Sequence, residues 1–171
     1  EPSITSFVNY DLVIKDIELS PANEFGENIY YSNNGRYVSY VKYNSDKKTN
    51  SVFVYDVLTK NEFNVYNTDK QIKKINWSNQ NSKLLIDMDN KFYLIDIKII
   101  SIINTISSDN IINLENFVEN IDNVYWNEEN DNSILVKSKS NLYKLDLKNF
   151  KTELIINDFV QDNLVYLNNK I

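Results

Sequence analysis

The sequence predicts an all-β fold: a β-propeller-like array of four-stranded antiparallel blades, with three recognisable blades plus a partial terminal blade. Two residue patterns that recur three times in the same order support this prediction, together with the length of the repeat. Four short strands in about 40–50 residues is the size of one propeller blade. The 171 residues are 42% hydrophobic and 25% charged, a balance typical of a folded domain with a core.

The first recurring pattern is an apolar run that carries an aspartate, with an aromatic residue three positions before it. The pairs are Phe53 with Asp56, Tyr93 with Asp96, and Tyr143 with Asp146, and the aspartates are 40 and then 50 positions apart. A catalytic or metal site is built once, whereas this residue recurs in every repeat. We therefore interpret each aspartate as an acceptor of backbone hydrogen bonds at a strand-end turn.

The second pattern precedes the first and consists of an aromatic strand end, a polar turn and a short apolar run. It reads Tyr30-Tyr31-Ser32, Asn76-Trp77-Ser78 and Tyr125-Trp126-Asn127. Trp77 and Trp126 fill the same column, so we expect them to pack between blades. The chain holds 29 Asn but only 2 Gly. Since Asn is the non-glycine residue that best tolerates positive φ, we expect it to replace Gly in the turns.

These patterns divide the chain into units. Blade 1 covers 27–68 with strands at 27–31, 37–42, 52–57 and 62–66. Blade 2 covers 69–106 with strands at 72–77, 83–88, 92–97 and 100–106. Blade 3 covers 107–158, with an insertion at 107–120 that could hold a short helix over 109–120, and strands at 121–126, 133–137, 142–147 and 152–156. Many of these runs are apolar on both faces, as expected of a blade between two neighbours.

The ends of the chain continue the repeat. Residues 1–26 are expected to supply strands of an incomplete or closing blade, and residues 159–171 the start of a fourth blade. Either the two ends pair and close a small four-bladed ring, or the chain is a piece of a longer propeller; the second alternative is favoured. An open array exposes apolar faces and sheet edges at its end blades, so self-association through them is a further expectation.

The frame of these repeats resembles the TolB-like, WD40-like propeller repeat over residues 27–157. The family turn Trp-Ser-Pro-Asp-Gly-Lys corresponds to Tyr31-Ser32-Asn33-Asn34-Gly35-Arg36, with Trp77-Ser78 opening the equivalent turn in the next unit. Tyr55-Asp56-Val57-Leu58-Thr59-Lys60 is similar to the family's Asp-Leu-x-Thr-Gly turn. The sequence departs from the pattern by lacking proline and most glycines. The resemblance implies an interaction platform or a gating cap beside an enzyme domain, and an extracytoplasmic or cell-envelope-associated location.

Composition excludes several function classes. With no His and no Cys, the chain has neither a Ser-His-Asp or Cys-His catalytic site nor a disulfide or Cys/His zinc site. Two glycines cannot build a phosphate-binding or dinucleotide loop. We expect no catalytic residue, no cofactor and no metal. A net charge of −6 argues against nucleic acid, and no apolar run is long enough for direct membrane insertion.

These observations predict a non-catalytic interaction or scaffold domain that binds a protein partner or the remainder of its own chain. The alternative is the propeller cap or sugar-binding portion of a hydrolase. The candidate binding residues lie in a tyrosine-rich stretch, because exposed Tyr is enriched in binding surfaces. They are Tyr30, Tyr37, Tyr40 and Tyr43, although alternation along the strand places part of this stretch toward the core.

Overall fold

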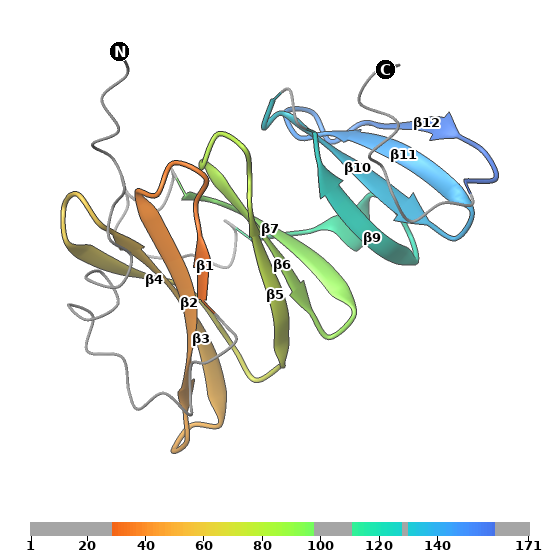
Figure 1. Ribbon diagram of the computed structural model, residues 1–171. Coiled ribbons are helices and arrows are strands. Elements are labelled where there is room, and N and C mark those ends of the chain that lie inside the picture. The colour runs from red at the N-terminus through yellow and green to blue at the C-terminus, as the bar shows by residue number, and fades with distance from the viewer. Residues whose placement is uncertain (1–28, 98–110, 128–129, 160–171) are drawn as a thin grey trace, which may run out of the picture.

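The computed structural model of the chain describes residues 29–97, 111–127 and 130–159. These residues form three four-stranded antiparallel sheets, and within each sheet the strands pair in the order in which they occur in the sequence. Figure 1 shows the sheets side by side, the middle one in green between an orange-to-olive sheet and a teal-to-blue one. The predicted all-β array of propeller blades is therefore confirmed.

The first sheet contains the longest strands. They are β1 (Ile29–Tyr31), β2 (Tyr37–Asn44), β3 (Thr49–Asp56) and β4 (Asn61–Thr68). An unbroken antiparallel ladder joins β2 to β3, from the pair of Tyr37 with Asp56 to the pair of Asn44 with Thr49. Alternating β-branched and aromatic residues in β3 favour this extended backbone, because such side chains pack well on a pleated surface.

The second sheet ends later in the chain than the sequence predicts. Its strands are β5 (Ile72–Trp77), β6 (Lys83–Met88), β7 (Lys91–Asp96) and β8 (Ile111–Asn113). The strand expected at 100–106 lies outside the described residues. Because β8 pairs with β7, with Ile112 opposite Leu94, the second blade extends to Asn113. The predicted boundary between residues 106 and 107 is therefore wrong.

The helix expected over 109–120 is also wrong. The described part of this segment begins with β8, which is followed by a single 3-10 turn, η2 (Leu114–Asn116). The Asn113 side chain begins the turn by accepting a hydrogen bond from the Glu115 amide at 3.1 Å. The apolar residues that suggested a helical stripe do share a buried side, since Leu114 and Val118 both join the core toward the third blade. Leu114 and Val118 are therefore buried by a strand and a tight turn, without a helix.

The third sheet follows the prediction. Its strands are β9 (Ile121–Trp126), β10 (Ser133–Ser138), β11 (Asn141–Asp146) and β12 (Thr152–Ile156). The strands expected within 1–26 lie outside the described residues, as does the fourth blade beyond residue 159. Within the described ranges, no helix has the length and apolar character needed to cross a membrane.

Two apolar cores hold the blades together. One contains Val52, Val54 and Val65 of the first blade with Ile75 and other residues of the second. The other joins the second blade to the third. Strand β6 of the second blade contributes to both cores, because Leu84 and Ile86 belong to the first core whereas the intervening Leu85 belongs to the second. Its run is apolar on both faces since successive side chains point to opposite neighbours.

The two tryptophans pack at the blade interfaces, as predicted. The Trp77 ring stacks on Tyr37, and its Nε1–H donates to the carbonyl oxygen of Tyr30 at 3.2 Å and to Ser39 Oγ at 3.0 Å. Ser39 lies opposite Tyr30 in the β1–β2 pair.

The equivalent tryptophan of the third blade lacks this arrangement. The buried Nε1–H of Trp126 has no hydrogen-bond partner among the described residues. In the first blade Ser39 lies opposite Tyr30. The equivalent pair in the second blade is Leu85 opposite Asn76, so a leucine stands where the first blade has Ser39. Leucine offers no acceptor, so the counterpart of the Trp77–Ser39 hydrogen bond cannot form at the second interface.

Candidate functional site

Two consecutive blades share one turn geometry between their first and second strands. Ser32 Oγ accepts the amide of Tyr37 at 2.9 Å, and the Gly35 amide donates to the carbonyl of Ser32 at 2.9 Å. In the second blade Ser78 Oγ likewise accepts the first amide of β6, and the Asn81 amide donates to the Ser78 carbonyl. Gly35 has φ 69° and Asn81 has φ 59°. Asn thus replaces Gly in the left-handed position, as predicted.

The repeated aspartates are the last residues of the third strand of each blade. Asp56 Oδ1 accepts the amides two and three residues further on, at 3.0 and 3.4 Å. Asp146 Oδ1 makes the same two bonds at 2.7 and 3.3 Å. Asp96 lies 3.8 Å from the Lys83 ammonium. The interpretation of these aspartates as turn acceptors is confirmed for Asp56 and Asp146.

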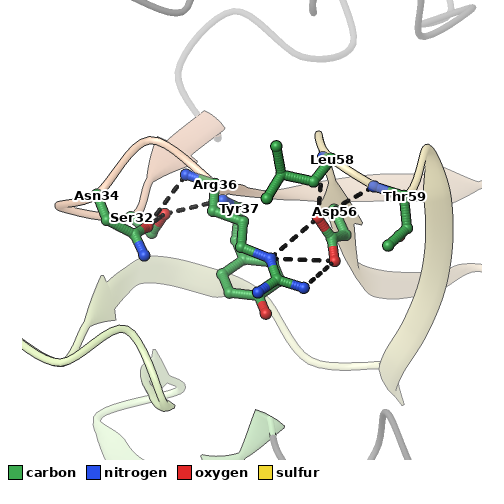
Figure 2. Close-up of polar contacts among 7 residues, drawn as sticks. All are labelled: Ser32, Asn34, Arg36, Tyr37, Asp56, Leu58 and Thr59. Carbon is green, nitrogen blue, oxygen red and sulfur yellow. Dashed lines mark hydrogen bonds and ion pairs between the residues drawn. The ribbon is translucent and has the colours of Figure 1, made fainter. Parts of the chain in front are cut away.

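Asp56 differs from the other two because it also binds the only arginine of the sequence. The Nε of Arg36 lies 3.2 Å from both carboxylate oxygens, and its Nη2 lies 2.8 Å from Oδ2 (Figure 2). Asp56 is 4% exposed. Burial acts to raise its pKa, but the Arg36 and turn-amide hydrogen bonds together lower the pKa below the ordinary value. Asp56 is therefore held as a carboxylate with its oxygens fully engaged.

Arg36 lies on an aromatic platform at the boundary of the first two blades. Its guanidinium carbon is 4.9 Å from the centre of the Tyr37 ring, and that ring stacks on Trp77 of the second blade at 5.6 Å. The hydrogen bond to Asp56 raises the pKa of Arg36, so the cation is permanent. The Arg36 side chain nevertheless remains 40% exposed. It thus presents part of its charged group to solvent beside an interface.

A cleft of about 280 Å³ opens at this position. Its walls come from the polar turns of two blades, and its floor comes from apolar residues of the first core. The lining residues are Asn34, Arg36, Tyr37, Val54, Asp56, Phe63, Val65, Gln80, Asn81 and Ile97. The two turns are tied together, because the Asn34 amide donates to Asn81 Oδ1 at 3.2 Å. The cleft therefore has a fixed polar rim.

At the interface between the second and third blades, a carboxylate takes the position that Asn81 has at the first interface. Asp131, only 2% exposed, extends from the third blade into the Ser78 turn. Its Oδ1 accepts the Gln80 amide at 3.0 Å, the bond that repeats the Asn34–Asn81 contact. Its Oδ2 accepts hydrogen bonds from the hydroxyls of Ser78 and Ser82. The two interfaces thus share one backbone-to-side-chain contact, made by an amide oxygen at the first and by a carboxylate oxygen at the second.

The four predicted tyrosines do not form one surface. Tyr30 and Tyr37 pack against the core shared with the second blade, and Tyr37 lines the cleft. Tyr40 is fully buried on the opposite side of the first blade, where its hydroxyl donates to Glu62 and its ring stacks on Phe53. Tyr43, near the far end of β2, is 52% exposed. Alternation along β2 places Tyr40 on the opposite face from Tyr37, and distance along the strand separates Tyr43 from Tyr37. Only Tyr37 belongs to the candidate site.

Sequence reasoning did not select Arg36, Asn34 or Gln80 as site residues. One signal in the sequence could have identified Arg36. It is the only arginine beside 17 lysines, and the next repeat has Ser82 at the equivalent position.

The cleft offers no group suited to proton transfer near neutral pH, because its only carboxylate is committed to five hydrogen bonds. In the described part of the chain, no cluster of acidic side chains could hold a metal ion. This chemistry suits binding.

Comparison with known proteins places the fold. No protein-family model matches the sequence, and no curated protein is significantly similar to it. The β-propeller domain of the Trilobed protease from Pyrococcus furiosus, which has an open velcro topology, is similar with a TM-score of 0.53 and 16% identity over 76% of this chain and 43% of that one. The acylaminoacyl peptidase of Pyrococcus horikoshii is similar with a TM-score of 0.54 and 14% identity over 78% of this chain and 25% of that one.

TolB from Acinetobacter baumannii is also similar, with a TM-score of 0.48 and 15% identity over 75% of this chain and 32% of that one. The two comparisons above a TM-score of 0.5 show that the chain has the β-propeller fold, which its resemblance to the TolB-like repeat implied. At these identities the likeness concerns the fold alone. The chain spans less than half of the Trilobed protease domain and a quarter of the peptidase.

Proposed function

We propose that this chain is a non-catalytic β-propeller interaction domain that binds a segment of a protein partner in the cleft between its first two blades. The cleft itself is the observation that supports the proposal: a solvent-accessible space with an apolar floor, an aromatic wall and a polar rim of arginine and amides. Such a combination is typical of protein–protein contact sites, where aromatic residues and Arg are enriched.

A neighbouring apolar side chain extends the proposed contact surface. Leu58 is 73% exposed and lies in the turn directly after Asp56, next to the Arg36–Asp56 pair (Figure 2). The Asp56 carboxylate fixes this turn by accepting the Leu58 amide. A partner that enters the cleft would therefore meet a rigid apolar group at the rim, which limits the conformational entropy lost on binding.

A steric block of the cleft tests this proposal. A displayed library of random twelve-residue peptides is selected on the wild-type protein, and the enriched peptides are titrated against Gln80→Trp and Gln71→Trp. Gln80 lies at the cleft and is exposed, whereas Gln71 is also exposed but precedes β5 at the opposite end of the blade. We expect at least tenfold weaker binding to Gln80→Trp and unchanged binding to Gln71→Trp. Equal binding to both variants, or no enrichment over a selection without protein, would overturn the proposal.

The second candidate function is that of a propeller cap in a hydrolase. Two solved structures with TM-scores above 0.5 are a protease propeller and an acylaminoacyl peptidase, which favours this alternative. The two functions differ in the behaviour of the full natural protein toward N-acetylated peptide anilides. Hydrolysis that is lost on mutation of a nucleophile elsewhere in the full protein supports the cap. Peptide binding without hydrolysis supports the interaction domain.

A further inference from the structure

The hydrogen-bonding groups of the cleft are unequally used. Its acceptors are occupied: Asp56 serves Arg36 and two turn amides, and Asn34 Oδ1 accepts from Ser32 Oγ at 2.9 Å and from the Arg36 amide at 3.0 Å. Asn81 Oδ1 accepts the Asn34 amide. The Asp56 carboxylate and Asn34 Oδ1 therefore have little capacity left for a ligand, whereas Asn81 Oδ1 keeps one lone pair.

Two donor groups of the cleft remain available, although Asn81 Nδ2 already donates to the Asn79 carbonyl at 3.4 Å. Arg36 uses Nε and Nη2 for Asp56, whereas its Nη1 makes no bond to any described residue. Within the described ranges, Asn34 Nδ2 likewise has no partner, and Figure 2 shows this nitrogen pointing away from the bonds of the turn. Gln80 and the Tyr37 hydroxyl can each donate or accept. The rim thus offers more N–H groups than oxygen acceptors.

The charge of the cleft favours neutral over anionic oxygens in a ligand that would accept hydrogen bonds from these donors. The Arg36 cation is neutralised by Asp56 at 2.8 Å, so the rim carries no net charge. The whole chain carries a net charge of −6, which disfavours approach of another anion. Neutral carbonyl oxygens satisfy N–H donors without this repulsion. The apolar floor of Val54, Phe63 and Val65 suits an aliphatic or aromatic side chain beside them.

We infer that the cleft binds an uncharged, extended peptide segment, whose backbone carbonyls accept from Arg36 Nη1 and Asn34 Nδ2 while one apolar side chain covers the floor. This inference rests on the proposed function and specifies its ligand. Extended backbone presents carbonyls at regular intervals, with side chains alternating between opposite sides. The guanidinium is oriented by its side-on pairing with Asp56, so less entropy is lost when it donates to a ligand.

Small blocked amino acids separate the ligand classes. N-acetyl-leucine N-methylamide, which is neutral, and N-acetyl-leucine, which is a carboxylate, are titrated into ¹⁵N-labelled protein while the amide resonances of residues 34–36 and 80–81 are followed. We expect the neutral compound to shift these resonances with millimolar affinity, at least fivefold tighter than the carboxylate. Raising NaCl from 0.05 to 0.5 M should change its affinity less than twofold, because no net charge is neutralised.

A matched pair of variants tests the assigned donor. Asn34→Asp keeps the oxygen that orders the turn but replaces the Nδ2 donor with an acceptor, and we expect roughly fivefold weaker binding of the neutral compound. Asn157→Asp adds the same charge at an exposed position of the third blade and should change nothing. Tighter, salt-sensitive binding of the carboxylate, unperturbed cleft resonances with both compounds, or an inert Asn34→Asp would overturn the inference. The peptide-selection result would then still decide the proposed function separately.

Discussion

Replacing Asp131 with asparagine is expected to weaken the hydrogen bonds that join the third blade to the Ser78 turn of the second. Ser78 Oγ already accepts the amides of Ser82 at 3.1 Å and of Lys83 at 3.0 Å, so its hydrogen must be donated to Asp131. The backbone N–H of Gln80 is a second donor, and it bonds to the other carboxylate oxygen of Asp131, Oδ1. Whichever way an asparagine amide is turned, its NH₂ group faces one of these donors. At least one buried hydrogen bond is therefore lost in Asp131→Asn.

The expected loss follows from the kind of bond removed. A hydrogen bond to a charged group contributes about 1.5–3 kcal/mol, and a buried donor left without a partner costs a similar amount. We expect Asp131→Asn to lower the free energy of unfolding by about 2–3 kcal/mol at pH 7. Asp89→Asn serves as the control, because Asp89 is exposed in a turn with φ 52° that asparagine also adopts. Its ion pair with Lys70 is exposed, so the control should change by less than about 0.5 kcal/mol.

The dependence on pH provides a second measurement. Burial acts to raise the pKa of Asp131, but hydrogen bonds from Ser78, Gln80 and Ser82 outweigh it and lower the pKa. A lowered folded-state pKa means that the carboxylate stabilises the fold above the unfolded value of about 3.9, and that this contribution is lost as pH falls through the folded-state pKa. The difference between wild type and Asp131→Asn should therefore shrink below about pH 4.

Urea unfolding followed by tryptophan fluorescence suits this test, since Trp77 and Trp126 lie at the two blade interfaces. Each protein is unfolded at pH 7, 5 and 3.5, and the free energies are compared at each pH. The other carboxyl groups titrate in both proteins, so the difference isolates residue 131. A loss no larger than that of the Asp89→Asn control, or a difference independent of pH, would refute the reasoning.

Three other predictions use different measurements. Arg36→Ala should raise the pKa of Asp56, because the hydrogen bonds to the guanidinium that lower it are lost; carboxyl ¹³C titration measures this, and an unchanged pKa would show that the turn amides alone set it. Ser39→Ala should shift only the indole N–H resonance of Trp77 and destabilise by about 1 kcal/mol in urea, and an effect on the Trp126 indole instead would contradict the assignment. Lys139→Gly should stabilise the fold by about 1 kcal/mol, because Lys139 adopts φ 53° in an exposed turn; no gain in the urea midpoint would show that this turn carries little strain.

Features shared by all repeats could be predicted from the sequence. The strand-end role of Asp56 follows from its recurrence, and the use of Asn81 where the first blade has Gly35 follows from the scarcity of glycine. The fourth strand of the second blade was expected at 100–106, and its position at Ile111–Asn113 was not predicted because no repeated residue marks it. Ile111 and Ile112 pair with β7 through backbone bonds at a sheet edge, and apolar spacing alone did not distinguish that strand from a helix.

The candidate cleft could not be predicted because it depends on differences between repeats. Arg36 in the first blade corresponds to Ser82 in the second. The Val57 amide donates to the Arg36 carbonyl at 2.9 Å, and the Ile97 amide donates to the Ser82 carbonyl at the same distance. Ser82 donates to Asp131 of the next blade, whereas Arg36 donates to Asp56 of its own blade. Which of these polar residues meet is decided by the placement of neighbouring blades, which one sequence does not reveal.

The position of the middle blade between two partners has a consequence for the order in which the protein opens. Every sheet pairs consecutive strands, so each described blade depends on its neighbours and not on distant segments. The second blade is held by an apolar core and by turn-to-turn hydrogen bonds on both sides, through Asn81 to the first blade and through Ser78 and Ser82 to the third. Its amides should therefore exchange with solvent more slowly than those of β1 or β12, and unfolding should begin at the outer blades and reach β6 last.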